Sequence, residues 1–352
     1  MIKEFGYEYD ATLNKELWNK CRGKVTHEKL WDAICLRSGR DTLKTIAREY
    51  KPTTVFMPAL ACDSMVFPFE MYGHNVTYYK LKEDYTVDIA YLNTVINDGI
   101  FLYMDYFGVR SISDENLEKL RIKYPKLIFV EDRTHNLIWD RDSCFQPDYI
   151  MASLRKWVNV PDGGLLWTKQ KLINQQFGED VRFSEKRLEA QCMRNKYFLS
   201  GDEKLKNEYR QIFSTVSEIM DEDRCPVRMT DYAYNIAKSI DWTEIRIQRQ
   251  ENARCLINIL QNAGVQFIQN NTGISDLYVA FNVGDRNIIQ TRLSAKGIFN
   301  TVIWPLNDEQ KSVCEIAKYT EEHMLAAPCD QRYSVKDMEY IGNEIVKVIA
   351  NS

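Results

Sequence analysis

Short apolar runs alternate with helical periodicities between about residues 30 and 170, and this alternation limits the folds open to the chain. The runs have the length of buried strands, and they lie at residues 54–60, 76–81, 99–105, 126–132, 149–153 and 164–168. Between several of them apolar residues recur at helical spacing, as at Leu43, Ile46, Ala47 and Tyr50, and at Leu117, Leu120 and Ile122. Such alternation predicts an α/β domain with a mostly parallel sheet covered on both faces. Ligands of these sheets bind at the carboxyl ends of the strands.

The pattern changes after about residue 180. Residues 183–262 are charged and helical, and an amphipathic helix is expected at 242–260. The segments that follow predict a strand pair at 264–269 and 275–283, a helix at 287–296, a strand at 299–304 and a helix at 335–350. We therefore expect two domains, a large one at 26–235 and a smaller α+β one at 236–352 that includes residues 1–25.

Composition excludes several classes of function. The formal net charge of -4 argues against nucleic-acid binding, which requires a basic face. Nine cysteines without CxxC spacing indicate free thiols in a reducing compartment, and four scattered histidines predict no metal site. No signal segment and no apolar run long enough to span a bilayer are found, so we expect a cytoplasmic protein.

The first segment with possible chemistry is residues 38–42, with the sequence Ser-Gly-Arg-Asp-Thr, at the start of a predicted helix. A small residue and a glycine at this position leave backbone N–H groups free to bind an anion. The same residues also suit plain helix capping by Ser38 or Asp41. The segment alone leaves both interpretations open.

The second segment ends the strand predicted at 126–132. Glu131 and Asp132 close that strand, and His135 follows three residues later. A carboxylate at a strand end can hold the ring nitrogen of a cofactor protonated, and the ring then acts as an electron sink. A surface turn with a charged rim is the alternative.

The third segment places Lys156 just past the strand at 149–153, three residues after Ser153 and shortly before Gly163 and Gly164. A neutral lysine amine can condense with an aldehyde and can move protons, and a serine hydroxyl can bind a phosphate. The paired glycines allow the chain to pass close to a bound group. One solvated lysine among many is the alternative.

Taken in this order, the segments resemble the DegT/DnrJ/EryC1/StrS sugar aminotransferases, which are fold type I enzymes of pyridoxal 5'-phosphate (PLP). Three family patterns are matched by Ser38, Gly39 and Leu43, by Glu131, Asp132 and His135, and by Lys156, Gly163 and Gly164. Residues 227–231 resemble the family's Tyr-Arg-Met-Ser-Asp, and residues 327–334 resemble the end of one branch. The likeness runs from about residue 36 to the C-terminus.

The resemblance implies a three-layer α/β/α fold of PLP fold type I, with a mostly parallel mixed sheet and a smaller α+β C-terminal domain. It implies that Lys156 holds PLP as a Schiff base and moves a proton, that Asp132 pairs with the ring nitrogen, and that His135 lies near the phenolic oxygen. The phosphate is expected on Ser153 and on the N–H groups of Gly39, Arg40 and Asp41. A second subunit normally completes the pocket, so a homodimer is implied.

Two positions depart from the family pattern. Cys62 stands where an aromatic residue usually stacks on the cofactor ring, and a thiol offers less contact. Pro226 stands where an asparagine usually reaches the phosphate of the neighbouring subunit. Arg40 is expected to supply the missing contact, because a guanidinium matches phosphate geometry. The alternative is an ion pair of Arg40 with Asp41, Asp132 or a carboxylate from the second chain.

The activity implied by the resemblance is transfer of an amino group from an amino acid, expected to be glutamate, to a nucleotide-linked keto-sugar. Such a reaction serves surface polysaccharide or glycoside biosynthesis. Another PLP-dependent reaction (elimination, decarboxylation or aldol cleavage) stays open, and so does a non-catalytic relative. The presence of Lys156 argues against the dehydratase branch of the family, in which this lysine is replaced.

Overall fold

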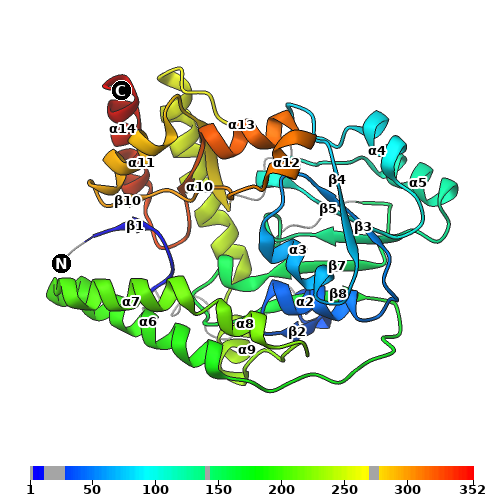
Figure 1. Cartoon of the computed structure of the whole chain (residues 1–352). Coiled ribbons are helices and arrows are strands. Elements are labelled where there is room, and N and C mark those ends of the chain that lie inside the picture. The colour runs from blue at the N-terminus through cyan, green and yellow to red at the C-terminus, as the bar shows by residue number, and fades with distance from the viewer. Residues whose placement is uncertain (1–2, 12–27, 139–142, 269–276) are drawn as a thin grey trace.

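The computed structural model describes residues 3–11, 28–138, 143–268 and 277–352, and a seven-stranded sheet lies at its centre (Figure 1). The strand order is β2-β8-β7-β6-β5-β3-β4. In chain order the strands are β2 (Ile34–Leu36), β3 (Thr54–Pro58), β4 (Asn75–Tyr79), β5 (Ile100–Met104), β6 (Ile128–Asp132), β7 (Tyr149–Ser153) and β8 (Gly164–Thr168). All neighbouring pairs from β4 to β7 are parallel, and β8 runs antiparallel to both β7 and β2. The predicted mostly parallel mixed sheet is confirmed.

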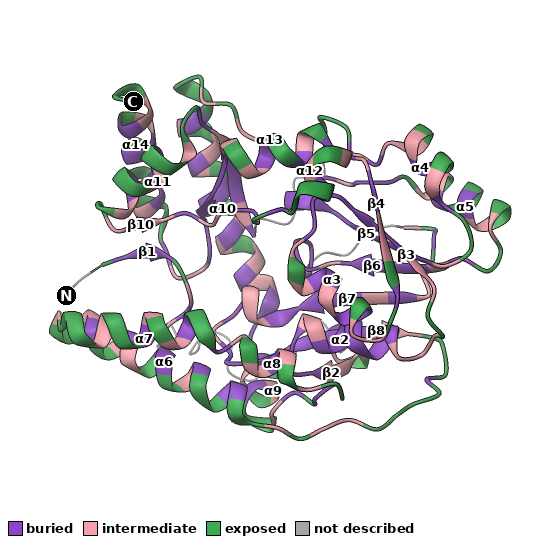
Figure 2. Cartoon of the chain, in the orientation of Figure 1, coloured by how far each residue is buried: buried purple, intermediate pink, exposed green. Residues whose placement is uncertain are grey.

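Helices cover both faces of this sheet, because neighbouring residues of a strand point to opposite sides. Met151 of β7 and Leu166 of β8 share a core with Leu43 of α2 (Gly39–Ala47). Ala152 and Leu165, the residues next to them, belong to a different core that includes α9 (Asp231–Lys238) and the start of α10 (Trp242–Asn262). The three-layer α/β/α arrangement follows from this division. Figure 2 shows the buried strands between helices whose outer faces are exposed.

The connections between the strands carry short helices. They are α3 (Asp63–Glu70), α4 (Ile89–Val95), α5 (Asp114–Lys123) and the 3₁₀ turns Glu28–Asp32, Tyr106–Gly108 and Leu154–Lys156. After β8 the chain forms a hairpin of α6 (Arg182–Ser200) and α7 (Glu203–Thr215), followed by α8 (Glu218–Glu222). Gly201 caps α6 with a φ of 74°, a left-handed conformation that glycine adopts without steric cost.

A second sheet lies in the C-terminal part. It consists of β9 (Tyr278–Asn282) antiparallel to β11 (Met324–Pro328), and a further pair joins β1 (Phe5–Gly6) to β10 (Ile298–Phe299) in parallel. The remaining helices are α11 (Arg286–Ser294), α12 (Asp308–Val313), α13 (Glu315–His323) and α14 (Val335–Ala350). The helices α11 and α14 pack in a core separate from that of the large sheet, and the C-terminal half of α10 contributes Ala253 and Leu256 to it. In contrast, Ala317 of α13 belongs to the core of the large sheet. The N-terminal strand β1 therefore packs with the C-terminal strand β10, in the part of the chain predicted to form the smaller domain. The predicted domain boundary at residue 235 stays a prediction.

One predicted strand is wrong. The expected strand at 299–304 is limited to the two residues of β10, followed by a single bridge between Thr301 and Ala326. Its partner β1 is itself only two residues long, and Pro305 has no N–H to donate to a ladder. The strands predicted at 264–269 and 275–283 meet in a single bridge between Phe267 and Phe281 of β9, and residues 269–276 lie outside the described residues.

Within the described ranges, every helix is too short or too polar to cross a bilayer.

Candidate active site

A cavity of about 240 Å³ lies at the carboxyl ends of β5, β6 and β7. Met104, Asp132 and Met151 face one another across these three strands in register, and all three line the cavity. Seven of the eight predicted cofactor contacts line it as well, namely Gly39, Arg40, Cys62, Asp132, His135, Ser153 and Lys156. Asp41 does not line it, so the expected cofactor contact of Asp41 is not supported.

Lys156 ends the 3₁₀ turn that follows β7, and its side chain lines the cavity. Among the described residues, no hydrogen bond or ion pair to the Lys156 amine is found. Burial lowers the pKa of Lys156, and the neighbouring Arg155 acts in the same direction, while Cys62 and Asp132 oppose them. A larger fraction of the amine is therefore neutral than in a solvated lysine, and the neutral form is the nucleophile.

Asp132 is the last residue of β6 and is only 4% exposed. Its carboxylate accepts the backbone N–H of Thr134 at 2.7 Å. Burial raises the pKa of Asp132, while the hydrogen bonds from Thr134 and the charge of Lys156 oppose that shift. No cationic side chain hydrogen-bonds this carboxylate within the part of the chain that the structure describes, so a positively charged ring nitrogen would satisfy it.

His135 is almost fully buried beside Asp132. Burial, together with the charge of Lys156, lowers the pKa of His135 to about 3, so the imidazole is neutral. Its Nδ1 faces the backbone N–H of Phe107 at 3.5 Å, a long contact that favours the ring proton on Nε2. The ring packs between Phe107 and Trp304, with centroid distances of 5.3 and 5.9 Å.

The start of α2 supplies the anion-binding end of the cavity. Ser38 caps the helix by accepting the N–H of Asp41 at 3.1 Å, as the capping interpretation expects. No acceptor for the N–H groups of Gly39 and Arg40 is found among the described residues, and the same is true of the Ser153 hydroxyl. Capping and anion binding are thus compatible, because they use different N–H groups of the first turn.

The Asp41 side chain does not line the cavity and forms an ion pair at the start of α2. Its carboxylate pairs with both Nε and Nη2 of Arg37 at 3.1 Å, and neither side chain is exposed. Arg37 also donates to Asp223 at 2.8 Å. Arg37 precedes the N-cap Ser38, so this pair joins the segment before α2 to the first turn of the helix.

Gly164 explains how the start of α2 reaches Ser153. Gly164 of β8 pairs with Ser153 of β7, and a Cβ on Gly164 would lie 2.2 Å from the carbonyl oxygen of Ser38. A Cβ on Gly39 would lie 3.2 Å from Met151 and 3.5 Å from Ser153. Gly164 is therefore required for the close approach of the two segments that form the anion-binding end, whereas a Cβ on Gly39 would need only a small shift of the Met151 side chain.

Sequence reasoning missed several lining residues. Trp304 comes from the irregular segment after β10, and Met220 comes from α8. The Nζ atom of Lys44, a buried residue of α2, donates to the backbone carbonyls of Met220 and Asp223 and holds α8 over the cavity. Arg155 also lines the cavity, so three cations, Arg40, Arg155 and Lys156, face one anion, Asp132. The lining favours an anionic ligand.

Arg40 pairs with a residue that the sequence did not suggest. Its Nη1 lies 2.8 Å from a carboxylate oxygen of Asp221 in α8, and its Nη2 donates to the Ser64 hydroxyl at 2.9 Å. Asp41 and Asp132, the partners considered within the chain, are not its ion-pair partners. Arg40 thus ties α8 to α2 while it lines the cavity.

If Arg40 binds the cofactor phosphate, as the resemblance implies, Arg40→Ala is expected to raise the dissociation constant of PLP about tenfold, about 1.4 kcal/mol. Titration of the apo form with PLP measures this constant. The melting temperature of the apo form should change little, since the pair with Asp221 is partly exposed. Asp221→Asn is the matched control, because it removes the ion pair and keeps Arg40. A fall in apo stability with unchanged PLP affinity would contradict the proposed contact.

No family model matches the sequence, and no curated protein matches it. Solved structures match over almost the whole chain. Helicobacter pylori PseC, an aminotransferase involved in pseudoaminic acid biosynthesis, matches with a TM-score of 0.70 and 15% identity, over 99% of this chain and 100% of PseC. The chain has the fold of the sugar aminotransferases.

Two further structures with this fold are similar. The putative sugar aminotransferase Spr1654 from Streptococcus pneumoniae, in its PMP form, matches with a TM-score of 0.69 and 14% identity, over 99% of this chain and 98% of its own. A DegT DnrJ EryC1 StrS aminotransferase from Brucella abortus matches with a TM-score of 0.64 and 13% identity, over 97% and 91%. These matches confirm the predicted fold class. At such identities the likeness concerns the fold, and activity has to be argued from the site.

Proposed function

We propose that the protein is a PLP-dependent aminotransferase in which Lys156 binds the cofactor. The observation that carries this proposal is the Lys156 amine, which has no hydrogen-bond or ion-pair partner among the described residues and shares a cavity with Asp132, His135 and Ser153. The residues fit PLP at each of its ends. In the described part of the chain, N–H groups at the start of α2 have no acceptor, and the buried Asp132 carboxylate at the end of β6 accepts the Thr134 N–H but has no hydrogen bond from a cationic side chain.

PLP, when bound, supplies an electron sink for the carbon that carries the amino group. Lys156 would hold the cofactor through Nζ and later accept and return a proton at that atom. Asp132 would keep the ring nitrogen protonated, and neutral His135 would donate a hydrogen bond from Nε2. Ser153, Arg40 and the N–H groups of Gly39 and Arg40 would bind the phosphate. Met220 and Trp304 would limit the access of water.

The proposed substrates are an amino acid, expected to be glutamate, and a nucleotide-linked keto-sugar, in surface polysaccharide or glycoside biosynthesis. Support comes from the motifs shared with the sugar aminotransferases, from the positive lining of the cavity, and from the fold shared with PseC and Spr1654. Cys62 lines the cavity as expected, and burial raises the pKa of its thiol, which keeps the thiol neutral.

The test is the visible spectrum of the protein purified with PLP. Glutamate should shift the whole absorption band to that of the amine form of the cofactor, and a keto-sugar nucleotide should restore it. The Lys169→Ala variant, which alters an exposed lysine just after β8, should behave like the wild type. A band that glutamate leaves unchanged would point to a different PLP reaction, and a protein that binds no PLP would contradict the proposal.

Asp132→Asn should retain part of the PLP affinity and lose about tenfold or more in the single-turnover rate. A neutral amide cannot stabilise the protonated ring nitrogen, and a charge-assisted hydrogen bond contributes about 1.5–3 kcal/mol. Rapid mixing with glutamate measures the rate. The matched control is Glu131→Gln, because Glu131 is the neighbouring buried carboxylate, pairs with Arg133 and does not line the cavity. An unchanged rate in Asp132→Asn would refute the role.

A homodimer is proposed as the active form, since the resemblance implies a pocket completed by a second subunit. Light scattering should give about twice the chain mass of 41.4 kDa under assay conditions. A monomer that retains full activity in the same sample would contradict this proposal.

A further inference from the structure

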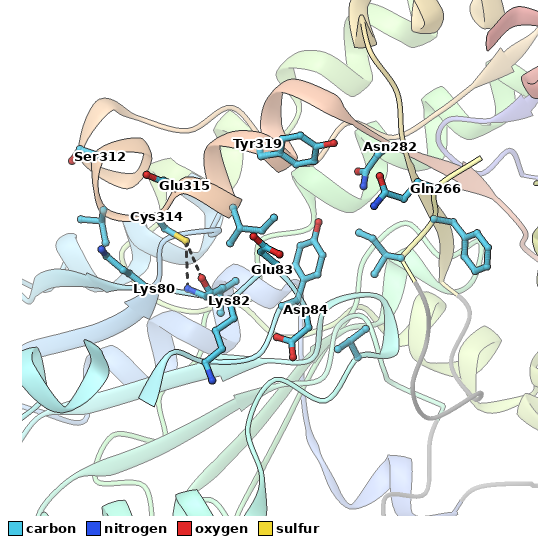
Figure 3. A pocket seen from close by; sticks show the side chains of 17 residues that line it. Lys80, Lys82, Glu83, Asp84, Gln266, Asn282, Ser312, Cys314, Glu315 and Tyr319 are labelled. Atoms are coloured by element: carbon cyan, nitrogen blue, oxygen red, sulfur yellow. Dashed lines mark hydrogen bonds between the residues drawn. The ribbon is translucent and has the colours of Figure 1, made fainter. Parts of the chain in front are cut away.

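A groove of about 980 Å³ on the described surface shares no lining residue with the candidate active site. Five segments form it: residues 80–85 after β4, Val109 before α5, residues 266–268, Asn282 of β9, and the stretch from the end of α12 into α13. Figure 3 shows the polar side chains that these segments direct to it. Its volume is sufficient for a small organic ligand.

Two carboxamides occupy one wall of the groove. Gln266 and Asn282 are opposite each other in an antiparallel register, since Phe267 bridges Phe281 and the Asn282 N–H donates to the Gln266 carbonyl at 2.9 Å. Their side chains lie side by side in Figure 3. The Asn282 Oδ1 is buried and accepts no hydrogen bond, and no partner for the Gln266 carboxamide is found among the described residues. The Gln266 side chain is exposed, so its carboxamide is the group of this wall that can donate to and accept from a ligand.

The charges of the groove distinguish it from the active site. The charged residues that line the groove give a net charge of -1, from Lys80, Lys82, Glu83, Asp84 and Glu315. The charged residues that line the candidate active site give a net charge of +2. Lys80 lies over the ring of Tyr91 at 4.8 Å, and Asp84 accepts hydrogen bonds from Thr86. No such partners are found for Glu83 and Glu315 within the described part of the chain. A phosphate-bearing ligand is therefore disfavoured, and a neutral or cationic one is favoured.

The lining as a whole matches a polyhydroxylated ring. Carboxamides donate to and accept from neighbouring hydroxyl groups, free carboxylates accept from hydroxyl or ammonium groups, and the 40% exposed Tyr319 offers a flat apolar face. We propose that this groove binds an unphosphorylated sugar or amino sugar, at a site separate from the catalytic cavity. The assignment rests on the groove's own contacts and does not depend on the proposed reaction.

An aromatic contact path joins the groove to His135. Tyr85 lines the groove, its hydroxyl lies 3.0 Å from that of Thr320 in α13, and its ring meets the Phe107 ring edge-on at 6.2 Å. Phe107 in turn packs on His135 at 5.3 Å. Tyr85 and Phe107 have φ values of 62° and 51°, and bulky residues in this left-handed region are rare and tend to cluster at functional sites. A ligand that moves Tyr85 would therefore alter the surroundings of His135 and Trp304.

Calorimetric titration with glucosamine, glucose and glucose 6-phosphate tests the site. Glucosamine should bind saturably with a dissociation constant on the order of 1 mM, glucose more weakly, and glucose 6-phosphate weakest of the three. Inorganic phosphate, which fits the positive cavity, should not compete. Asn282→Ala and Gln266→Ala should each weaken glucosamine about tenfold, while Asn287→Ala, an exposed asparagine in α11, should not. Absent saturation, wild-type affinity for glucosamine in both groove variants, or tightest binding of the phosphorylated sugar would overturn the assignment.

The path to His135 is tested with glucose, which has no amine to react in the catalytic cavity. Glucose should change the protein fluorescence, and most of that change should vanish in Trp304→Phe. Phe107→Gly, which keeps a left-handed backbone and removes the ring, should retain glucose binding and lose the fluorescence change. A change of full size in Phe107→Gly would show that the groove does not act through this path. The spectrum with glutamate is a separate measurement, so failure here and failure of the proposed reaction are distinguishable.

Discussion

Lys156→Ala is expected to abolish covalent retention of PLP and to lower the rate of amino transfer about 10²–10⁴-fold, the range typical of losing a positioned acid–base group. The reason is that the Lys156 amine is the one lysine nitrogen lining the cavity within the described residues. A stopped-flow assay with glutamate measures the loss. Added PLP should still bind non-covalently, because the groups at the start of α2 are unchanged.

Two variants make this result specific. Lys156→Arg retains a cation but cannot condense with an aldehyde, so it should be as inactive as Lys156→Ala. Lys169→Ala removes an exposed lysine and should keep the wild-type rate. Activity of Lys156→Arg near that of the wild type would show that Lys156 acts only through its charge.

Arg37→Ala is expected to cost about 3–5 kcal/mol of unfolding free energy, because it leaves the fully buried Asp41 carboxylate without its cation. Burial alone would lower the pKa of Arg37, but the pairs with Asp41 and Asp223 raise it, so the guanidinium is charged throughout the pH range in which the fold is stable. PLP affinity should fall as well, since Asp41 also accepts the Val227 N–H and so holds the start of α2 in place. Denaturant unfolding and PLP titration measure the two effects.

The matched control for Arg37 is Arg182, whose side chain is 56% exposed and which pairs with Asp180 at 2.7 Å. Arg182→Ala should cost far less unfolding free energy than Arg37→Ala, because water replaces the lost interaction. The double variant Arg37→Met with Asp41→Leu should recover much of the stability lost in Arg37→Ala, since no buried charge is left unpaired. Equal losses in Arg37→Ala and Arg182→Ala would mean that burial of the pair is unimportant.

The large sheet and the main site residues could be predicted because both depend on local patterns. Buried strands appear as continuous apolar runs, and the five parallel strands β3 to β7, together with the antiparallel β8, were found within a few residues of their ends. Asp132 and Ser153 each close such a run, and the carboxyl ends of neighbouring parallel strands meet at one edge. Their convergence with Lys156 therefore follows from the sequence once the strands are recognised.

Contacts made over long sequence separations could not be predicted in this way. Trp304 lies in an irregular segment 148 positions after Lys156, and no periodicity marks it. Met220 reaches the cavity only because Lys44 and Arg40 fix α8 above α2. The strand β2 has only three residues, which is too short a run to be recognised as a strand in the sequence. The sequence also could not show that the N–H group of Asp41 donates to the Ser38 side chain and is therefore not free to bind an anion.

The most direct test of cofactor binding by Lys156 is reduction of the PLP-bound protein with borohydride, followed by proteolysis and mass spectrometry of the peptides. We expect one pyridoxyl group per chain, on the peptide that contains Lys156, and none in the Lys156→Ala variant. A pyridoxyl group on a different lysine, or none on the wild-type protein, would contradict it.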